Sequence, residues 1–466
     1  MSGVALTARG GYAPRLAALA MAMLLPSLGT SIANVALPTL AASFGATMAE
    51  VQWVVISYLL AITSLIVGAG RFGDIVGRRR VLLLGMALFA AASAGCAIAP
   101  RLEILIAARA IQGLGAAVMM ALTVAMVGDL VPKERTGSAM GLLGTVSAAG
   151  TALGPSLGGA LIAGFGWPSI FLALAALGMV GLLAGRTLFP PDAGATRQAV
   201  ALDLTGMALL ALSLCAGSVS LTLGGRMPGT LVVAISLASL LGFFLFLRHE
   251  TRVRAPLVRM DLLCRRSIGP GLLSTLLVSA ILMATLVVGP FYLSGVLGLD
   301  PVRTGLVMSA GPGVAALTGA PAGRLIDRRG PDRVVVAGLV VVTAGAALLT
   351  VLPVRSGVGG YIASLAIVTF GYALFQAANT TTIMQATNSD ERGVTAALLG
   401  LSRNLGLIAG ASAMGAVYAL GPGLAETVGI RLGPDGGLQL TFATATGLAA
   451  LALTSALWGQ RRGRTP

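Results

Sequence analysis

The sequence lacks most of the side chains from which catalytic and metal sites are built. It has one histidine, His249, and three cysteines among 466 residues. A single histidine forms no cluster of metal ligands, so we expect no metal site. We expect no other cofactor either. Cys96 and Cys215 fall in apolar runs and Cys264 in a basic linker, which does not suggest a disulfide framework. No glycine-rich loop ends in Gly-Lys-Ser or Gly-Lys-Thr, so bound ATP is not an expected source of energy.

Charged residues are also scarce, at 10% of the chain, while 56% of the residues are hydrophobic and the mean hydropathy is +0.93. Soluble globular proteins do not have such a composition. The apolar residues fall in runs of about 20, the length that a helix needs to cross a bilayer core. The net charge of +15 lies in short clusters between these runs, so nucleic acid is not an expected partner. The composition predicts an all-α integral membrane protein surrounded by membrane lipids.

Charged, proline-rich and glycine-rich interruptions divide the apolar runs into fourteen candidate membrane-spanning helices. They cover residues 15–40, 51–70, 81–99, 104–128, 137–163, 168–188, 204–224, 229–247, 269–296, 303–323, 334–353, 358–385, 393–420 and 438–458. The first resembles a secretory signal, but it continues to Pro38 without a convincing cleavage site, so we expect it to be retained.

Basic residues set the expected orientation, because Lys and Arg are enriched in cytoplasmic loops. With fourteen spans, most of the 31 Lys and Arg residues fall at the two chain ends and in the loops on the same side. The loops on the other side hold Arg101, Arg226, Arg303, Arg355 and Arg431. We therefore expect both termini to be cytoplasmic.

A short charged block occurs twice in this apolar chain. GRFGDIVGRRR at 70–80 and GRLIDRRGPDR at 323–333 share Gly, Arg, Asp and Gly at the same spacings. A second pair of similar segments, ERTGSAMGLLG at 134–144 and ERGVTAALLG at 391–400, follows each block. Such internal repeats are common in secondary transporters. The expected domains are an N-terminal six-helix half at 1–188, two additional helices with cytoplasmic linkers at 189–267, and a C-terminal six-helix half at 268–466.

The first block resembles the signature of the major facilitator superfamily in Gly70, Asp74, Gly77, Arg78 and Arg79. Four further motifs are similar to those of its fourteen-helix drug/proton antiporter branch: SIANVALP at 31–38, QWVVISYLLA at 52–61, RAIQG at 109–113 and GTALGPSLGG at 150–159. The resemblance covers nearly the whole chain. It implies the major facilitator fold, a bacterial-type inner membrane, function as a monomer, and efflux of small amphipathic drugs or metabolites by alternating access in exchange for protons.

The block contains groups suited to a gate. Gly70, Gly73 and Gly77 permit close backbone approach and a tight turn. Asp74 can pair with Arg78 or with the positive end of a neighbouring helix, and in the family the cluster includes an acid where this chain has Asp129. We expect a cytoplasmic gate and proton-coupling site, with a latch to the second half, at Gly70, Asp74, Gly77, Arg78, Asp129 and Asp327, the acid of the second block. The alternative is that the arginines only fix the topology.

Small residues recur at a spacing of four in the predicted span 137–163. They are Gly150, Gly154 and Gly158, followed by Gly159, with Pro155 as a bend. This spacing lets helices touch closely. Packing alone would explain it equally well, while the resemblance favours a helix that seals the path between the halves.

Arg109 and Arg403 lie deep in apolar spans, where a guanidinium costs about 2.5 to 3.5 kcal/mol. We expect each to face a wet cavity or a polar partner, and Gln112 lies one turn from Arg109. The alternative is that these arginines snorkel or brace helix backbones. Other candidates for an intramembrane substrate cavity are Asn34, Gln376, Asn379, Phe291 and Tyr292, each of which could equally be a packing residue.

The resemblance fails at Gly29. Many relatives carry an aspartate there, two residues before the Ser or Thr that leads into Asn-Val-Ala-Leu-Pro. All 16 Asp and Glu residues of this chain fall in loops or at the ends of the predicted helices. Because a buried carboxylate attracts cations and carries protons, its absence favours neutral or anionic substrates. It leaves Asp74 and Asp129 as the candidate proton carriers.

Three functions follow from these patterns. The favoured one is proton-coupled efflux of small amphipathic compounds, and the first alternative is an uncoupled or anion-exchanging exporter of one endogenous metabolite. A non-transporting scaffold or sensor is disfavoured, because it would have no need of a gate. An enzyme is not expected, since the sequence offers no nucleophile with a base, no metal cluster and no paired intramembrane carboxylates.

Overall fold

The computed structural model describes residues 13–462 except 133–134, 193–202, 225–226, 254–255, 257, 264, 389–390 and 428–432. Both chain ends, Arg226, Arg431 and Cys264 therefore lie outside the described residues. The described part is helical throughout and contains no strand. Cys96 and Cys215 are free thiols.

The first half of the chain forms a bundle that agrees with the predicted spans to within a few residues. Its helices are α2 (Ala13–Phe44), the single turn α3 (Met48–Val51), α4 (Trp53–Val76), α5 (Arg78–Ala97), α6 (Leu102–Leu130), α7 (Thr136–Phe165) and α8 (Pro168–Leu188). In this half α2 packs on α7, α4 on α6, and α5 on both α6 and α8.

The second half begins after a basic linker and repeats the long apolar helices. They are α12 (Gly269–Phe291) with a π-helical end (Tyr292–Val296), α13 (Pro301–Arg329), α14 (Pro331–Gln385), α15 (Arg392–Ala409), a π-helical segment (Gly410–Met414), α16 (Gly415–Thr427) and α17 (Gly436–Arg462). Here α12 packs on α15 and α17, and α14 packs on α13 and α17. The two π-helical segments were not expected from the sequence.

Two additional helices, α9 (Leu204–Leu223) and α10 (Gly229–Glu250), separate the halves in sequence, and the linker after them contains the short α11 (Met260–Leu263). They pack on each other, and α9 also contacts α4. Their membrane-length windows are 22% and 6% buried, against 78% for α12 with its π-helical end. They are therefore peripheral, whereas α12 is central.

Twelve helices of the described part are long and apolar enough to cross a membrane. The expected count of fourteen is not confirmed. One difference is α13, which is not among the twelve. The other is α14, which counts once although its backbone leaves helical geometry at Gly357, with φ 55° and ψ −132°.

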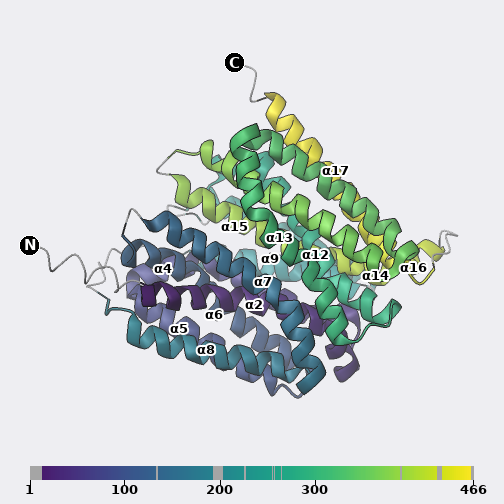
Figure 1. The fold of residues 1–466 in the computed structure, drawn as a ribbon, viewed down its shortest axis with the longest axis horizontal. Coiled ribbons are helices and arrows are strands. Elements are labelled where there is room, and N and C mark those ends of the chain that lie inside the picture. Colours follow the sequence, from purple (N-terminus) through teal and green to yellow (C-terminus); the bar gives the residue numbers. More distant parts are fainter. Residues whose placement is uncertain are drawn as a thin grey trace, which may run out of the picture.

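The two halves lie side by side, with the purple-to-blue half below the green-to-yellow half in Figure 1. Their contact includes α7 against α13 and α2 against α12. We call the face that carries the α4–α5 turn the block face. Contacts described below place the linker after α10 and the start of α15 on this face as well. The block face is thus one end of the helix bundle, and we call the other end of the bundle the opposite face.

Candidate functional site

The first charged block forms an ion cluster at the turn between α4 and α5. Gly77 makes that turn with a φ of +117°, a value that favours glycine. The Arg78 guanidinium bonds to Asp74 Oδ1 through Nε and to Asp129 Oδ2 through Nη1, both at 2.8 Å. The cluster thus joins α4, α5 and α6. Its side chains are partly exposed, so each ion pair contributes roughly 0 to 1 kcal/mol.

The described contacts of this cluster stay within the first half, since Arg78 also donates to the Ala125 carbonyl of α6. The expected latch to the second half therefore stays a prediction. The expectation that Gly70 permits close backbone approach is wrong, because a Cβ there would meet open space. The same expectation for Gly73 agrees with the structure, since a Cβ at this position would collide with the Leu122 side chain.

The second block is built differently from the first. Asp327 is exposed in the last turn of α13. The turn after α13 is made by Gly330, with a φ of +80°. In this copy Asp332, at the start of α14, contacts the far end of the same helix beyond the break at Gly357, because its Oδ1 accepts a hydrogen bond from Thr382 at 3.3 Å.

An acid that the sequence analysis missed, Asp192, holds the start of α5. Its carboxylate accepts hydrogen bonds from the backbone N–H groups of Arg79 and Arg80, at 2.9 and 3.3 Å. A carboxylate at a helix N-terminus satisfies open N–H groups and meets the positive end of the helix dipole. The Arg79 side chain donates to the carbonyls of Arg186 and Phe189, so this arginine braces the end of α8.

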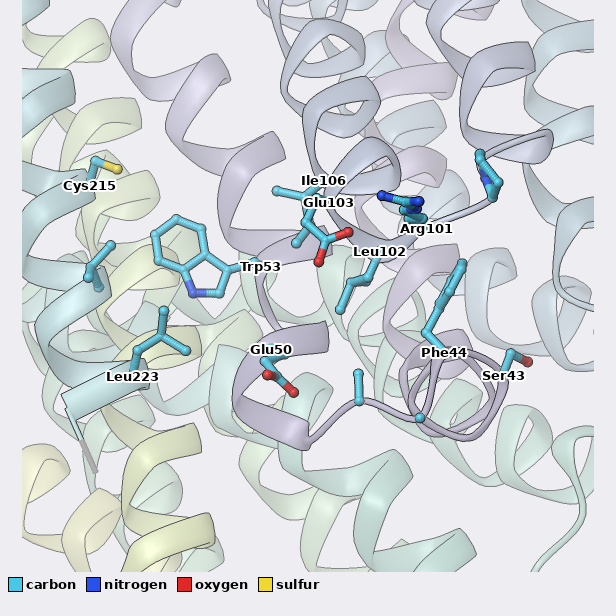
Figure 2. A pocket seen from close by; sticks show the side chains of 14 residues that line it. Ser43, Phe44, Glu50, Trp53, Arg101, Leu102, Glu103, Ile106, Cys215 and Leu223 are labelled. Carbon is cyan, nitrogen blue, oxygen red and sulfur yellow. The ribbon is translucent and has the colours of Figure 1, made fainter. Parts of the chain in front are cut away.

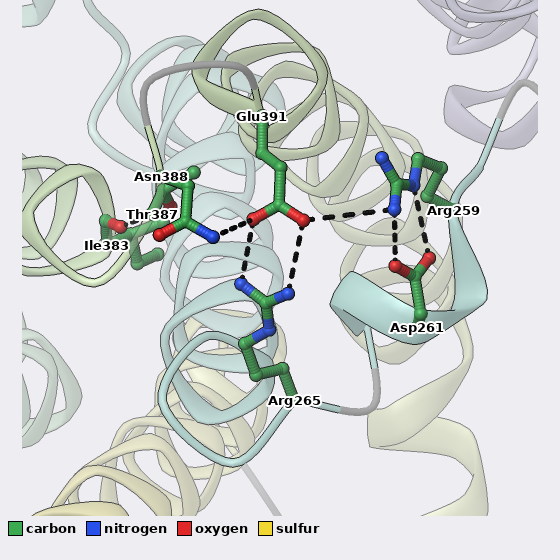
Figure 3. Close-up of polar contacts among 7 residues, drawn as sticks. All are labelled: Arg259, Asp261, Arg265, Ile383, Thr387, Asn388 and Glu391. Atoms are coloured by element: carbon green, nitrogen blue, oxygen red, sulfur yellow. Dashed lines mark hydrogen bonds and ion pairs between the residues drawn. The ribbon is translucent and has the colours of Figure 1, made fainter.

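A second ion network, also missed, ties the linker after α10 to the start of α15 (Figure 3). Arg265 donates to both carboxylate oxygens of Glu391, at 2.9 and 3.2 Å. Arg259 lies 3.8 Å from the same carboxylate and pairs with Asp261. The hydrogen bonds from Arg265 hold the pKa of Glu391 below its usual range. The only signal in the sequence was Glu391 itself, which heads the second repeated segment.

The small residues of α7 make its closest contacts with α2. A Cβ added at Gly154 would collide with Ser31, and one at Gly158 would press into Ile32. At Gly150 an added Cβ would lie 3.0 Å from the Leu24 carbonyl. The spacing of four therefore serves helix packing within the first half.

Gly159 faces the other half of the molecule. A Cβ at Gly159 would collide with the Pro301 carbonyl of α13 and lie 3.3 Å from the Gly305 α-carbon. A Cβ at Gly305 would in turn collide with the Pro155 carbonyl of α7. The two halves thus touch backbone to backbone toward the opposite face, where α13 begins.

Arg109 is fully buried in α6, at 0% exposure. Its Nε donates to the Val54 carbonyl at 2.9 Å, its Nη2 to the Gly29 carbonyl at 3.2 Å, and its Nη1 to the Gln112 side chain. The guanidinium also lies 4.0 Å from the centre of the Tyr58 ring, a cation–π contact. These partners are all neutral. Arg109 is thus braced inside the first half, as the alternative interpretation proposed.

Gly29 belongs to this cluster and not to a substrate cavity. A Cβ at Gly29 would lie 3.3 Å from Tyr58 Oη and 3.4 Å from a Phe89 ring carbon. An aspartate there would therefore enter the surroundings of Arg109. In this chain backbone carbonyls and the Tyr58 ring take the place of that counter-ion, and Gln112 is itself fixed by donating to Ser93 at 2.6 Å.

A cavity of about 340 Å³ lies between the halves. Residues of α2, α7, α12, α13, α14 and α15 line it, including Met23, Ser147, Thr151, Thr285, Met308, Thr369, Tyr372 and Arg403. The lining is mostly apolar with several hydroxyls, and among the described residues that line it there is no Asp or Glu and one charged side chain, Arg403.

The other polar and aromatic candidates are not among the residues that line this cavity. Asn379 donates to the Gly271 carbonyl and to Thr275, which ties α14 to α12. Asn34 donates to the Thr30 carbonyl in its own helix. The others pack elsewhere: Gln376 is half-buried in α14, Phe291 packs on the core, and Tyr292 stacks on Tyr361 and donates to Asp435.

A second hollow, of about 760 Å³, lies on the opposite face between the first half and α9 (Figure 2). Phe44, Glu50, Trp53, Arg101 and Glu103 are among its lining residues. Two of these are held by neighbours, since Glu50 accepts from Thr47 and Trp53 donates to Thr222 at 3.0 Å. The helices of the second half do not line it, so it is not a path between the halves.

Comparisons with known proteins agree with this architecture. The family model of the Major Facilitator Superfamily matches residues 19–411. The riboflavin transporter RibZ of Clostridioides difficile is 28% identical over 393 residues, which cover 84% of this chain and 85% of that protein. The drug efflux pump JefA of Mycobacterium tuberculosis is 31% identical over 422 residues, covering 87% and 80%.

A solved structure of the peptide transporter POT has the same fold, with a TM-score of 0.69 at 16% identity over 96% of this chain and 95% of that one. Other relatives are export or efflux proteins, such as the tetracenomycin C resistance and export protein of Streptomyces glaucescens, at 29% identity over 90% of this chain and 79% of that protein. The chain therefore belongs to the Major Facilitator Superfamily, and it is a multi-pass membrane transporter and not an enzyme.

Proposed function

We propose that the chain is a secondary transporter that exports small amphipathic compounds from a bacterial cytoplasm across the inner membrane, in exchange for protons. It works as a monomer with fourteen spans: six at 1–188, two at 189–267 and six at 268–466. The break at Gly357 supports two spans within α14, and the length of α13, 29 residues, supports one more. The block face is cytoplasmic in this proposal, as are both termini, because it carries most of the arginines.

The observation that carries the proposal is the cavity of about 340 Å³ between the halves. Lining residues come from both halves, so a molecule held there touches both of the bodies that move during alternating access. Toward the opposite face the α7–α13 contact at Gly159 and Gly305 closes the path. A rocking motion that opens this contact would expose the cavity to the other side of the membrane.

The lining favours neutral or anionic substrates. Arg403 can attract an anionic group, Tyr372 can stack on a ring, and the hydroxyls of Ser147, Thr151 and Thr369 can hydrogen-bond to polar groups. No carboxylate among the lining residues would hold a cation. The names of relatives as different as a riboflavin transporter and drug efflux pumps agree with a broad amphipathic range.

Proton coupling is assigned to Asp74 and Asp129, which share Arg78 on the block face. A chain carrying both Asp74→Asn and Asp129→Asn is expected to lose accumulation of riboflavin driven by a pH gradient in proteoliposomes, while exchange of riboflavin across the membrane without a gradient continues. Removing both acids eliminates the groups that can exchange protons next to the gate. The control is Glu103→Gln, an exposed acid near the start of α6. Gradient-driven accumulation by the double variant equal to that of the wild type would rule out this assignment.

An uncoupled or anion-exchanging carrier is the second candidate, favoured by the absence of a carboxylate from the cavity lining. Such a carrier would show saturable counterflow of riboflavin or fluorescein in the wild type, with no proton movement on substrate addition. The same proteoliposomes, loaded with a pH-sensitive dye, distinguish the two candidates.

A further inference from the structure

Helix α9 lies over the place where α4 of the first half meets the π-helical segment Gly410–Met414 of the second half, which we call the seam. It packs on α3 and α4, and also on α16 and the π-helical segment. At the seam the halves touch, because a Cβ added at Gly415 would collide with the side chain of Gln52 at the start of α4. Since α4 reaches the block face at its other end, the seam lies toward the opposite face.

Two side chains of α9, one turn apart, hydrogen-bond to different halves. Thr222 Oγ1 accepts from the Trp53 indole Nε1 of α4 at 3.0 Å, and Figure 2 shows Trp53 extending toward α9 near Leu223. Ser218 Oγ accepts from Ser412 Oγ of the π-helical segment at 3.1 Å. Ser218 and Ser412 are 3% and 1% exposed, and a hydrogen bond shielded from water in this way is stronger than an exposed one. Helix α9 thus joins the two halves across the seam.

A different side of α9 is fastened to α10. The hydroxyls of Ser220 and Ser236 lie 2.6 Å apart, so α9 and α10 form one hairpin. The linker after this hairpin is bonded to the first half at the block face, where the Pro256 carbonyl accepts from Arg71 Nη2 of α4 at 3.2 Å. The hairpin is therefore attached to α4 toward both faces, through Trp53 and through Arg71.

We propose that α9 is a clasp that holds the two halves together at the seam and releases the second half each time the transporter opens toward the opposite face. The inference rests on the alternating access of the proposed function. Opening separates α4 from the π-helical segment, and Ser218 and Thr222 cannot then keep both partners, because they lie about 6 Å apart on one helix. The bond between Ser218 and Ser412 is the one that breaks, since the hairpin is attached to α4 toward both faces.

The clasp is weak enough to open in every cycle. One buried hydrogen bond favours the closed state about fivefold. The α7–α13 contact at Gly159 and Gly305 lies on other helices, so the clasp and that contact hold the closed state separately. At the block face the linker also binds the second half, through Arg265 and Glu391. Those bonds lie at the other end of the bundle, so they do not prevent separation at the seam.

A cross-link between α9 and the second half tests the clasp. In a chain without its native cysteines, Ser218→Cys and Ser412→Cys place two thiols across the seam. Met308→Cys in the cavity reports opening through its reaction with a membrane-impermeant maleimide added from the opposite face. Oxidation of the pair is expected to slow this reaction at least about tenfold relative to Met308→Cys alone. The matched control carries Ser220→Cys and Ser236→Cys instead, which join α9 to α10, and its oxidation should leave the reaction unchanged.

The outcomes separate the clasp from the proposed function. Equal reaction of Met308→Cys in the oxidised seam pair and in the oxidised control pair would mean that the seam does not open. That result would overturn the clasp while alternating access stands. If Met308→Cys alone does not react from the opposite face at all, the rocking motion of the proposed function fails, and the clasp fails with it.

Deletion of one hydroxyl tests the same bond without a cross-link. Ser218→Ala is expected to speed the reaction of Met308→Cys from the opposite face about fivefold, because the closed state loses one buried hydrogen bond. Ser236→Ala is the matched control, since it removes an equally small group from the contact between α9 and α10. Equal reaction rates in the two variants would overturn the proposal, even if the cross-linked protein is locked.

Discussion

A Gly159→Val variant is expected to fold and insert normally but to lose at least about nine tenths of the proposed transport activity, measured with riboflavin as a probe. The added side chain would collide with the Pro301 carbonyl of α13, and a backbone atom cannot turn aside as a flexible side chain can. Overpacking of this kind costs about 1 to 3 kcal/mol. Because the contact joins the two halves, that cost falls on the state that is closed toward the opposite face. Each 1.4 kcal/mol changes the population of that state about tenfold.

The matched control is Gly164→Val, on the same helix, where a Cβ meets open space. Conformation can be followed without a substrate through Met308→Cys, which places a thiol in the cavity of a chain without its native cysteines. With Gly159→Val this thiol should react faster with a membrane-impermeant reagent added from the opposite face. Unchanged reaction and transport would mean that the α7–α13 contact does not seal the path.

An Arg109→Ala variant is expected to lose about 3 to 5 kcal/mol of stability and most of its transport. The substitution leaves a buried cavity. It also leaves the Val54 carbonyl, the Gly29 carbonyl and the Gln112 side chain without the hydrogen bonds that Arg109 donates to them. Arg109→Lys should recover only part of the loss, since an ammonium cannot reproduce the planar fork stacked on Tyr58.

Thermal unfolding of the detergent-solubilised protein measures this effect. Arg101→Ala serves as the control, because Arg101 is exposed just before the same helix begins. A melting temperature of Arg109→Ala equal to that of Arg101→Ala would contradict the bracing role.

Contacts within one helix or across one turn were predictable from the sequence. Arg109 and Gln112 lie on one face of α6, while Asp74 and Arg78 lie on either side of the Gly77 turn, and each pair is bonded in the structure. The two copies of the block fall at the α4–α5 turn of the first half and at the turn after α13 in the second half. By contrast, the Gly29 carbonyl as a partner of Arg109 could not be predicted, because it depends on how three helices pack.

The rotation of each helix was the main quantity that the sequence did not provide. In a soluble protein, the polar residues of a helix mark the face that points to water, so the opposite face is known to point inward. The helices of this bundle are apolar on every side, so their sequences do not mark the inward face in this way. Asn379 and Arg403 look alike as polar residues in apolar spans. Asn379 ties α14 to α12, whereas Arg403 lines the cavity. The arginines of the linker after α10 were likewise read as topological signals, and their pairing with Glu391 required the fold.

The central claim is that substrate binds in the cavity between the halves, next to Arg403 and away from any carboxylate. The most direct test is the initial rate of transport of fluorescein, riboflavin and ethidium, as anionic, neutral and cationic probes, by wild-type and Arg403→Gln protein in proteoliposomes. The wild type should prefer fluorescein and riboflavin to ethidium. Arg403→Gln should lower the fluorescein rate about tenfold, the effect of one lost hydrogen bond to a charged group, and the riboflavin rate much less. A wild type that prefers ethidium, with rates that Arg403→Gln leaves unchanged, would contradict the account.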